Sequence, residues 1–137
     1  MSSDVRSELS KRNPYHLGKH KFLELKHFCL QYPDWKKAYL ELSQGRYPET
    51  IGREIRGTGT PDSTSDIAIE MHWYHEKMDL IKRVAEETDD EIGSYIFLAV
   101  TNGYPFSYLK TKLEIPCERD MYYDRYRKFF WKLAKER

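Results

Sequence analysis

The sequence predicts an all-α protein, a helical bundle with a C-terminal helix-turn-helix. Apolar residues recur at spacings of three and four over most of its 137 residues, which is the period of a helix face. No segment shows the apolar–polar alternation of a half-buried strand, and the chain has no internal repeat. Between residues 89 and 137, two short helical segments and one long basic segment are separated by tight turns. A chain of this length fits one domain of ordinary size.

The first 18 residues are polar and end in Asn13-Pro14 and Gly18. They lack the apolar centre of a secretory signal. We therefore expect residues 1–18 to form a flexible N-terminal arm.

Two helices are expected next, and together they would form an N-terminal helical hairpin over residues 19–44. Phe22 and Phe28 lie on one face of the first helix, which Pro33 is expected to end. Asp34 follows as the expected N-cap of the second helix.

Residues 45–65 are rich in glycine and proline and are expected to form a loop or linker. A loop of this length inside a compact domain is unusual and is either disordered or functional. It carries Arg46, Arg53 and Arg56, so both a nucleic-acid contact and a solvated linker stay open.

Residues 66–137 are expected to form a long helix followed by the helix-turn-helix region. Ser65 or Asp66 would cap the long helix, whose apolar residues alternate spacings of four and three. These residues are Ile67, Met71, Tyr74, Met78, Ile81 and Ala85. The pattern lasts under three heptads, which favours packing within the chain over a coiled-coil dimer. Thr88, with Glu91 three residues later, predicts a capping box for the next helix.

The C-terminal segment shows the outline of a helix-turn-helix. One helix is expected to end at Gly103 in a left-handed conformation, and Pro105 to open a short helix over residues 106–112. After a second turn, a long basic helix is expected from Cys117 to about Lys135. Two short helices joined by a tight turn, followed by a long basic helix, are typical of this motif.

The long basic helix supplies the candidate DNA contacts. The first residues of a recognition helix meet base edges in the major groove, where arginine pairs with guanine, and later basic residues reach phosphates. The candidates for base contacts are Glu118, Arg119, Tyr122 and Tyr123, and those for phosphate contacts are Arg125, Arg127, Lys128 and Lys132. The apolar stripe expected to pack on the preceding helices is Tyr122, Tyr126, Phe129, Phe130 and Leu133.

Several stretches resemble the RinA/ArpU-like phage late-gene transcription regulators, whose helix-turn-helix is similar to region 4 of bacterial sigma factors. In the C-terminal half they are YIFLAVTNGY (95–104), Tyr108-Leu109, LEIPCER (113–119) and YYDRYRKFFW (122–131). In the N-terminal half they are FCLQYPDWKK (28–37) and STSDIA (63–68). The resemblance covers most of the chain, through patterns of residue type.

The resemblance implies sequence-specific binding to double-stranded DNA and activation of late genes in the cytoplasm of a bacterial host cell. By matched position it places DNA contacts on Arg119, Tyr122, Tyr123, Arg125 and Arg127. The sequence departs from this expectation at Glu118 and Asp120, whose carboxylates would repel phosphate at the start of the recognition helix.

The charge distribution is consistent with a charged partner although the formal net charge is only +1. Residues 1–61 hold 11 basic and 7 acidic residues, and residues 93–137 hold 9 basic and 5 acidic ones. Between them, residues 62–92 hold 3 basic and 10 acidic residues. The acidic middle segment suggests a second kind of contact, with a protein such as RNA polymerase, through Glu86, Glu87, Asp89 and Asp90.

Two alternatives to a transcription regulator stay open. The protein could be a phage inhibitor or adaptor that binds another protein on a helix-turn-helix scaffold, or a small DNA-packaging subunit. The chain could form a homodimer, whereas a DNA-packaging subunit would require a ring.

An enzyme, a metal centre and a membrane protein are not expected. The chain has no phosphate-binding, dinucleotide-binding or nucleophile-elbow motif, and no apolar run long enough to span a bilayer. Cys29 and Cys117 form no CxxC pair, and the His16/His20 and His72/His75 pairs do not match HExxH. We therefore expect no catalytic residue, no cofactor and no bound metal.

Overall fold

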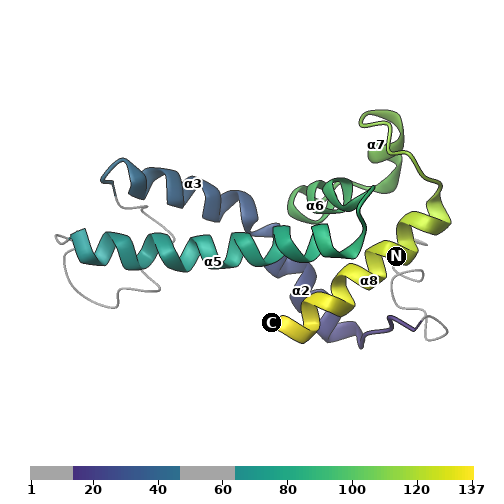
Figure 1. Ribbon diagram of the computed structural model, residues 1–137, viewed down its shortest axis with the longest axis horizontal. Helices are drawn as coiled ribbons and strands as arrows, with labels where there is room; N and C mark the ends of the chain where they lie inside the picture. The colour runs from purple at the N-terminus through teal and green to yellow at the C-terminus, as the bar shows by residue number, and fades with distance from the viewer. Residues whose placement is uncertain (1–13, 47–63) are drawn as a thin grey trace. The chain divides into compact units, whose positions relative to one another are not determined.

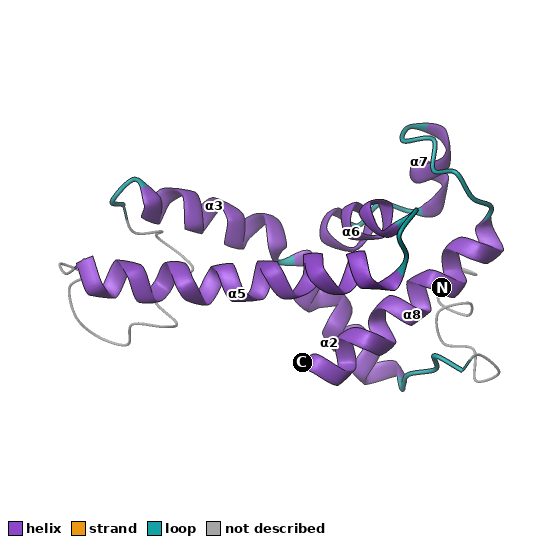
Figure 2. Cartoon of the chain, in the orientation of Figure 1, coloured by secondary structure: helices purple, strands orange, loops and turns teal. Residues whose placement is uncertain are grey.

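The computed structural model describes residues 14–46 and 64–137, which are helical and contain no strand (Figure 2). The helices are α2 (Lys19–Leu30), α3 (Tyr32–Ser43), α5 (Thr64–Thr88), α6 (Gly93–Asn102), α7 (Phe106–Thr111) and α8 (Arg119–Glu136), labelled in Figure 1. The predicted all-α class is confirmed for this part of the chain. Most of the predicted arm, and most of the loop with Arg53 and Arg56, lie outside the described residues.

The chain divides into two compact units. Unit 1 combines Met1–Leu30 with Ile81–Arg137, and unit 2 spans Gln31–Leu80. Helix α2 therefore belongs to unit 1 and α3 to unit 2, whereas residues 19–44 were expected to form one hairpin. Helix α5 contributes its first part to unit 2 and its last two turns to unit 1.

The core of unit 1 is built around α8, with α2 packed on both α6 and α8. The ring of Phe22 in α2 lies 5.1 Å from the ring of Phe130 and 6.4 Å from that of Tyr126, measured between centroids. Leu25 and Cys29 of the same helix are fully buried. Helix α2 thus supplies part of the apolar surface on which the C-terminal helices fold.

Unit 2 is smaller and packs around α3 and the first part of α5. Trp35, Ala38 and Leu42 are buried on α3, at spacings of three and four, and Tyr74 is buried on α5. The rings of Tyr39 and His75 lie 6.3 Å apart between these helices. Of the apolar series predicted on α5, Tyr74, Ile81 and Ala85 are buried and the others half-buried, so the series packs within the chain.

The start of α3 corrects one sequence expectation. The preceding helix ends at Leu30 and α3 begins at Tyr32, so Pro33 lies in the first turn of α3 rather than ending α2. Proline is tolerated there because the first amides of a helix have no acceptor within the helix. Gln31 occupies the N-cap position predicted for Asp34, which lies in the first turn of the helix.

The connection from α5 to α6 corrects a second expectation. Thr88 does not form a capping box, because it is the last residue of α5 and its hydroxyl donates to the Val84 carbonyl at 2.7 Å. The N-cap of α6 is Ile92, which has no side-chain cap, and Asp89 holds the turn before it, since its Oδ1 accepts the amides of Glu91 at 2.8 Å and Ile92 at 2.9 Å. Glycine is required at residue 93, because a Cβ there would lie 2.6 Å from the Ala85 carbonyl oxygen.

The turns around α7 follow the prediction closely. Gly103 ends α6 with a φ of 75°, and its amide donates to the Ala99 carbonyl at 2.8 Å. Pro105 directly precedes α7. The connection to α8 has seven residues, 112–118, and is held by the Ile115 amide, which donates to the Leu109 carbonyl at 3.0 Å.

Candidate nucleic-acid interface

Helix α8 is anchored through a broad buried face. Its buried side chains are Tyr122, Tyr123, Tyr126, Phe129, Phe130 and Leu133. They recur at spacings of three and four, and the aromatic rings contact one another at centroid distances of 4.9 to 5.7 Å. This face holds α8 in the core, so contacts with a partner must come from the remaining faces.

Tyr122 and Tyr123 are therefore core residues, and the expectation that they contact bases is corrected. Their side chains are only 2% and 5% exposed, which leaves no surface for a base edge. The ring of Phe106 in α7 lies 5.3 Å from that of Tyr122. The buried face of α8 is wider than the predicted apolar stripe, because it includes Tyr123 as well as Tyr122.

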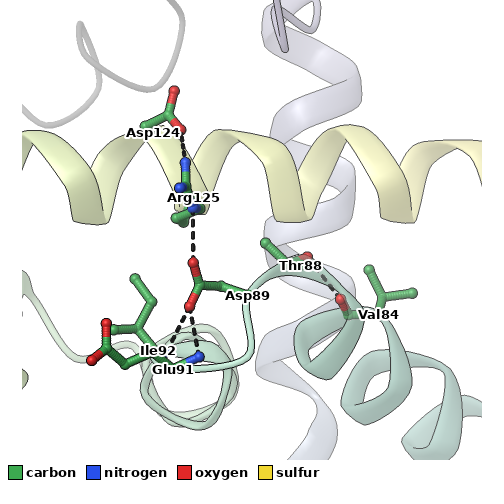
Figure 3. A network of polar contacts seen from close by, with 7 residues as sticks. All are labelled: Val84, Thr88, Asp89, Glu91, Ile92, Asp124 and Arg125. Atoms are coloured by element: carbon green, nitrogen blue, oxygen red, sulfur yellow. Dashed lines mark hydrogen bonds and ion pairs between the residues drawn. The ribbon is translucent and has the colours of Figure 1, made fainter.

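Arg125 is held inside unit 1 by two carboxylates (Figure 3). Its Nε donates to Oδ2 of Asp89 at 2.8 Å, and its Nη1 contacts Asp124 on the same helix. The same Asp89 carboxylate accepts the Glu91 and Ile92 amides through its other oxygen. Arg125 thus joins the turn before α6 to the middle of α8, and it is not part of the proposed DNA interface.

The electrostatics of this network favour the ionised forms. Burial alone would raise the pKa of Asp89, but the hydrogen bonds from the Ile92 amide, from Arg125 and from the Glu91 amide lower it below its ordinary value. The hydrogen bond to Asp89 in turn raises the pKa of Arg125. The ion pair is therefore fully charged at neutral pH.

Two other predicted contacts, Arg119 and Arg127, differ in exposure. Arg119, the first residue of α8, is exposed, and its guanidinium lies 5.0 Å from the centre of the Tyr123 ring. Arg127 is half-buried. Both side chains make interactions within the chain, so their charges are positioned rather than freely rotating.

The outer side of α8 carries a line of lysines. Lys128, Lys132 and Lys135 recur at spacings of four and three, which places them on one face; we call these three residues the basic face. Lys128 and Lys132 were predicted contacts, whereas Lys135 was not. Its signal in the sequence was the seven-residue spacing from Lys128.

Trp131 lies beside the basic face and orders part of it. The Lys135 ammonium is 3.4 Å from the centre of the Trp131 ring, and the Tyr15 ring meets Trp131 edge-on at 5.2 Å. A residue from the end of the predicted arm therefore packs next to the basic face. Sequence reasoning gave no sign of this contact, because the two aromatic residues are far apart in the chain.

The first turns of α8 are acidic on their outer side. Glu118 and Asp120 are exposed and Asp124 is half-buried. Lys110 of α7 binds Glu118 at 2.9 Å and the Cys117 carbonyl at 3.1 Å, which fixes the end of the turn before α8. The basic face lies in the C-terminal half of the helix, beyond these carboxylates.

The acidic residues predicted to bind a protein are divided by the structure. Glu86 and Asp90 are exposed, and Glu87 lies 3.6 Å from Arg83 in an exposed ion pair. Asp89, in contrast, is committed to Arg125. Three of the four predicted carboxylates are therefore on the surface.

Cys117, in the connection before α8, is buried. Burial raises the pKa of its thiol, Lys110 opposes this, and Asp89, Glu118 and Glu91 raise it further.

No metal centre is found in the described parts of the chain. Over residues 14–46 and 64–137, no three histidine, cysteine, aspartate or glutamate side chains come together as ligands. His72 lies 2.9 Å from Glu76 in an exposed pair, and His75 packs against Tyr39. Within the same ranges, no helix has both the length and the apolar character required to cross a bilayer.

Comparison of the chain with protein-family models, curated proteins and solved structures finds no match.

Proposed function

We propose that the protein binds duplex DNA through the basic face of α8 and acts as a phage-type transcription regulator, an activator of late genes. The observation that carries this proposal is the arrangement of α8 itself. One side is fixed in the core by six large side chains, and the opposite side presents Lys128, Lys132 and Lys135 in a line. Lysines held on one face of a rigid helix suit the regularly spaced phosphates of a duplex.

The order of the last three helices supports the same proposal. Helix α6, the three-residue turn 103–105, helix α7 and the long helix α8 follow the outline of a helix-turn-helix. The seven-residue connection before α8 is longer than the three to four residues of a standard motif. In the proposed arrangement α8 is the recognition helix, and the longer connection sets the angle at which it is presented.

The acidic first turns of α8 shift the contacts along the helix. Carboxylates at Asp120 and Asp124 repel phosphate, so phosphate contacts fall on the C-terminal half of α8. Arg119 lies four residues before Tyr123 and seven before Tyr126, on the side of the buried face, and is not part of the basic face. Arg127 lies one position from Lys128 and adds positive charge at the edge of the basic face. The interface proposed here is therefore narrower than the one predicted from the sequence.

The test is fluorescence anisotropy of a labelled duplex, titrated with the full chain at low salt. Lys128→Ala combined with Lys132→Ala should weaken binding by roughly tenfold or more, since two phosphate contacts are lost. The matched control is Lys36→Ala combined with Lys37→Ala, two exposed lysines on α3, which should leave affinity unchanged. Equal affinity of the wild type and the Lys128/Lys132 variant would contradict the proposal. Selection from a random-sequence duplex pool then tests sequence specificity.

One observation favours a second candidate, an adaptor that binds a basic protein surface. Three exposed carboxylates, Glu86, Asp90 and Glu91, lie within six residues of one another at the end of α5 and in the turn before α6. An acidic surface of this kind matches a basic protein partner, such as a polymerase subunit, better than it matches DNA. A stoichiometric partner that survives nuclease treatment, and that Glu86→Lys with Asp90→Lys removes, would favour this candidate.

A further inference from the structure

Trp131 and Lys135 form a pair in which an aromatic ring holds a lysine side chain. The Lys135 ammonium lies 3.4 Å from the centre of the Trp131 ring, and the two residues are four positions apart on α8. A ring attracts an ammonium through its face but carries no net negative charge. Lys135 therefore keeps its positive charge, in contrast to Arg125, whose charge is offset by the Asp89 carboxylate.

The position of Lys135 on α8 directs this charge away from the core. Because successive residues turn by about 100° around a helix, Lys135 comes between Lys128 and Trp131 and opposite the centre of the buried face. Lys135 is exposed. The carboxylate of the next residue, Glu136, is bound by Arg83 of α5 at 2.8 and 3.2 Å, so it already has a cation as its partner.

Tyr15 restrains the ring on which Lys135 rests. Its own ring meets the Trp131 ring edge-on at 5.2 Å, and both residues belong to unit 1. Phe22, seven residues later, packs on Phe130, the neighbour of Trp131. The segment between Tyr15 and Phe22 is thus attached to α8 at both ends.

A second pair of the same kind, Trp73 and Lys77 on α5, lies in an acidic part of the chain. The Lys77 ammonium is 4.2 Å from the centre of the Trp73 ring. Glu76 and Asp79, close to Lys77 in the sequence, are exposed, whereas Lys77 itself is half-buried. This pair supplies a matched control, because the same interaction occurs in unit 2, on a helix other than α8.

We propose that Trp131 is a positioning residue of the DNA interface, whose ring, restrained by Tyr15, holds the Lys135 ammonium in place to bind a phosphate of duplex DNA. A lysine side chain loses rotational freedom when it binds, and Lys135 has lost part of that freedom before DNA arrives. The ammonium has three N–H donors, and those that point away from the ring can donate to phosphate oxygens. The inference rests on the proposed function, since it assigns a role within the same interface.

The experiment is fluorescence anisotropy of the labelled duplex with the full chain, arranged as a double-variant cycle. Trp131→Leu removes no charge, yet it should weaken binding by roughly threefold or more, as should Lys135→Ala. The two substitutions together should weaken binding little more than Lys135→Ala alone, because Trp131 acts through Lys135. Trp131→Phe keeps a ring face and should retain most of the affinity. The matched control, Trp73→Leu, should leave the affinity unchanged.

A measurement on the protein without DNA tests the positioning itself. The ring current of Trp131 should shift the NMR signals of the Lys135 side-chain methylene protons upfield, because the side chain lies over the ring face. Trp131→Leu should abolish this shift, and Tyr15→Ala should reduce it. Circular dichroism establishes that each variant keeps its helices.

Three results would overturn the inference alone while the wild type binds DNA. They are unshifted Lys135 signals, a Trp131→Leu variant with wild-type affinity, and a Trp131→Leu loss that is equally large with and without Lys135. The last result would make Trp131 a structural residue or a direct DNA contact. A wild type that does not bind DNA would overturn the proposed function and this inference with it.

Discussion

Asp89 and Arg125 are 36 residues apart in the sequence, and their side chains form an ion pair at 2.8 Å. The pair joins the turn that starts α6 to the middle of α8. Asp89 is only 11% exposed and Arg125 33%, so water screens their attraction less than it would for a surface pair. This contact adds a polar link to the aromatic packing that holds α8 in unit 1.

Removing the carboxylate should destabilise the protein. We expect Asp89→Ala to lower the free energy of unfolding by about 2 kcal/mol, because one charged hydrogen bond and two amide contacts are lost. Asp90→Ala changes the neighbouring, exposed residue and should cost less than about 0.5 kcal/mol. Urea unfolding followed by circular dichroism measures both, and equal costs for the two variants would show that Asp89 holds nothing in place.

The contribution of Asp89 should depend on pH in a definite direction. Its pKa is lowered in the folded protein, so its stabilisation is present above the ordinary aspartate pKa of about 4 and is lost as pH falls through the folded value. We expect the stability difference between the wild type and Asp89→Ala to be constant near neutral pH. It should shrink towards zero in acid, and a difference that grew on acidification would have the wrong sign for this contact.

Helices α5 and α6 approach each other closely at Gly93. Gly93→Ala should destabilise the protein by about 1 to 3 kcal/mol, because the new methyl group would lie 2.6 Å from the Ala85 carbonyl oxygen and the backbone must shift. Gly18→Ala is the matched control, since a Cβ there meets nothing within 4 Å. Thermal unfolding of both variants decides the point: the two should differ clearly, and similar melting temperatures would contradict the close packing.

Helix α2 should be required for the C-terminal helices to fold. Phe22 is 2% exposed and packs against Tyr126 and Phe130, so Phe22→Ala should cost about 3 to 5 kcal/mol. Leu30→Ala, at a residue 39% exposed on the same helix, should cost much less. A chain that begins at residue 31 should lose cooperative unfolding, and a cooperative transition in that truncated chain would contradict the assignment of α2 to unit 1.

The sequence was a good guide to the helices and a poor one to the partners of single side chains. Local signals placed the left-handed Gly103, the proline before α7 and the long basic helix, because each depends on neighbouring residues. The predicted Thr88 capping box was wrong, because the Thr88 hydroxyl donates to the Val84 carbonyl within α5. The amides of the turn donate to Asp89 instead, and the other oxygen of Asp89 binds Arg125 in α8. No local pattern could show that partner.

The same limit explains the differences at the candidate interface. From the sequence, Arg125 and Lys128 were both expected to contact phosphate. In the structure Arg125 binds the Asp89 carboxylate, which comes from the turn before α6. Tyr122 and Tyr123 were candidates for base contacts because the first residues of a recognition helix meet base edges, although Tyr122 was also expected in the apolar stripe. The helices packed around α8 instead bury both rings, and which sides of a helix are covered depends on the whole fold.

The central claim is that the basic face of α8 contacts DNA phosphates, and the salt dependence of binding tests it most directly. The logarithm of the binding constant should fall linearly with the logarithm of salt concentration. Combining Lys128→Ala with Lys132→Ala should make that slope shallower by about 2, one for each lost phosphate contact, whereas Lys36→Ala with Lys37→Ala should leave it unchanged. An unchanged slope in the Lys128/Lys132 variant would contradict the claim.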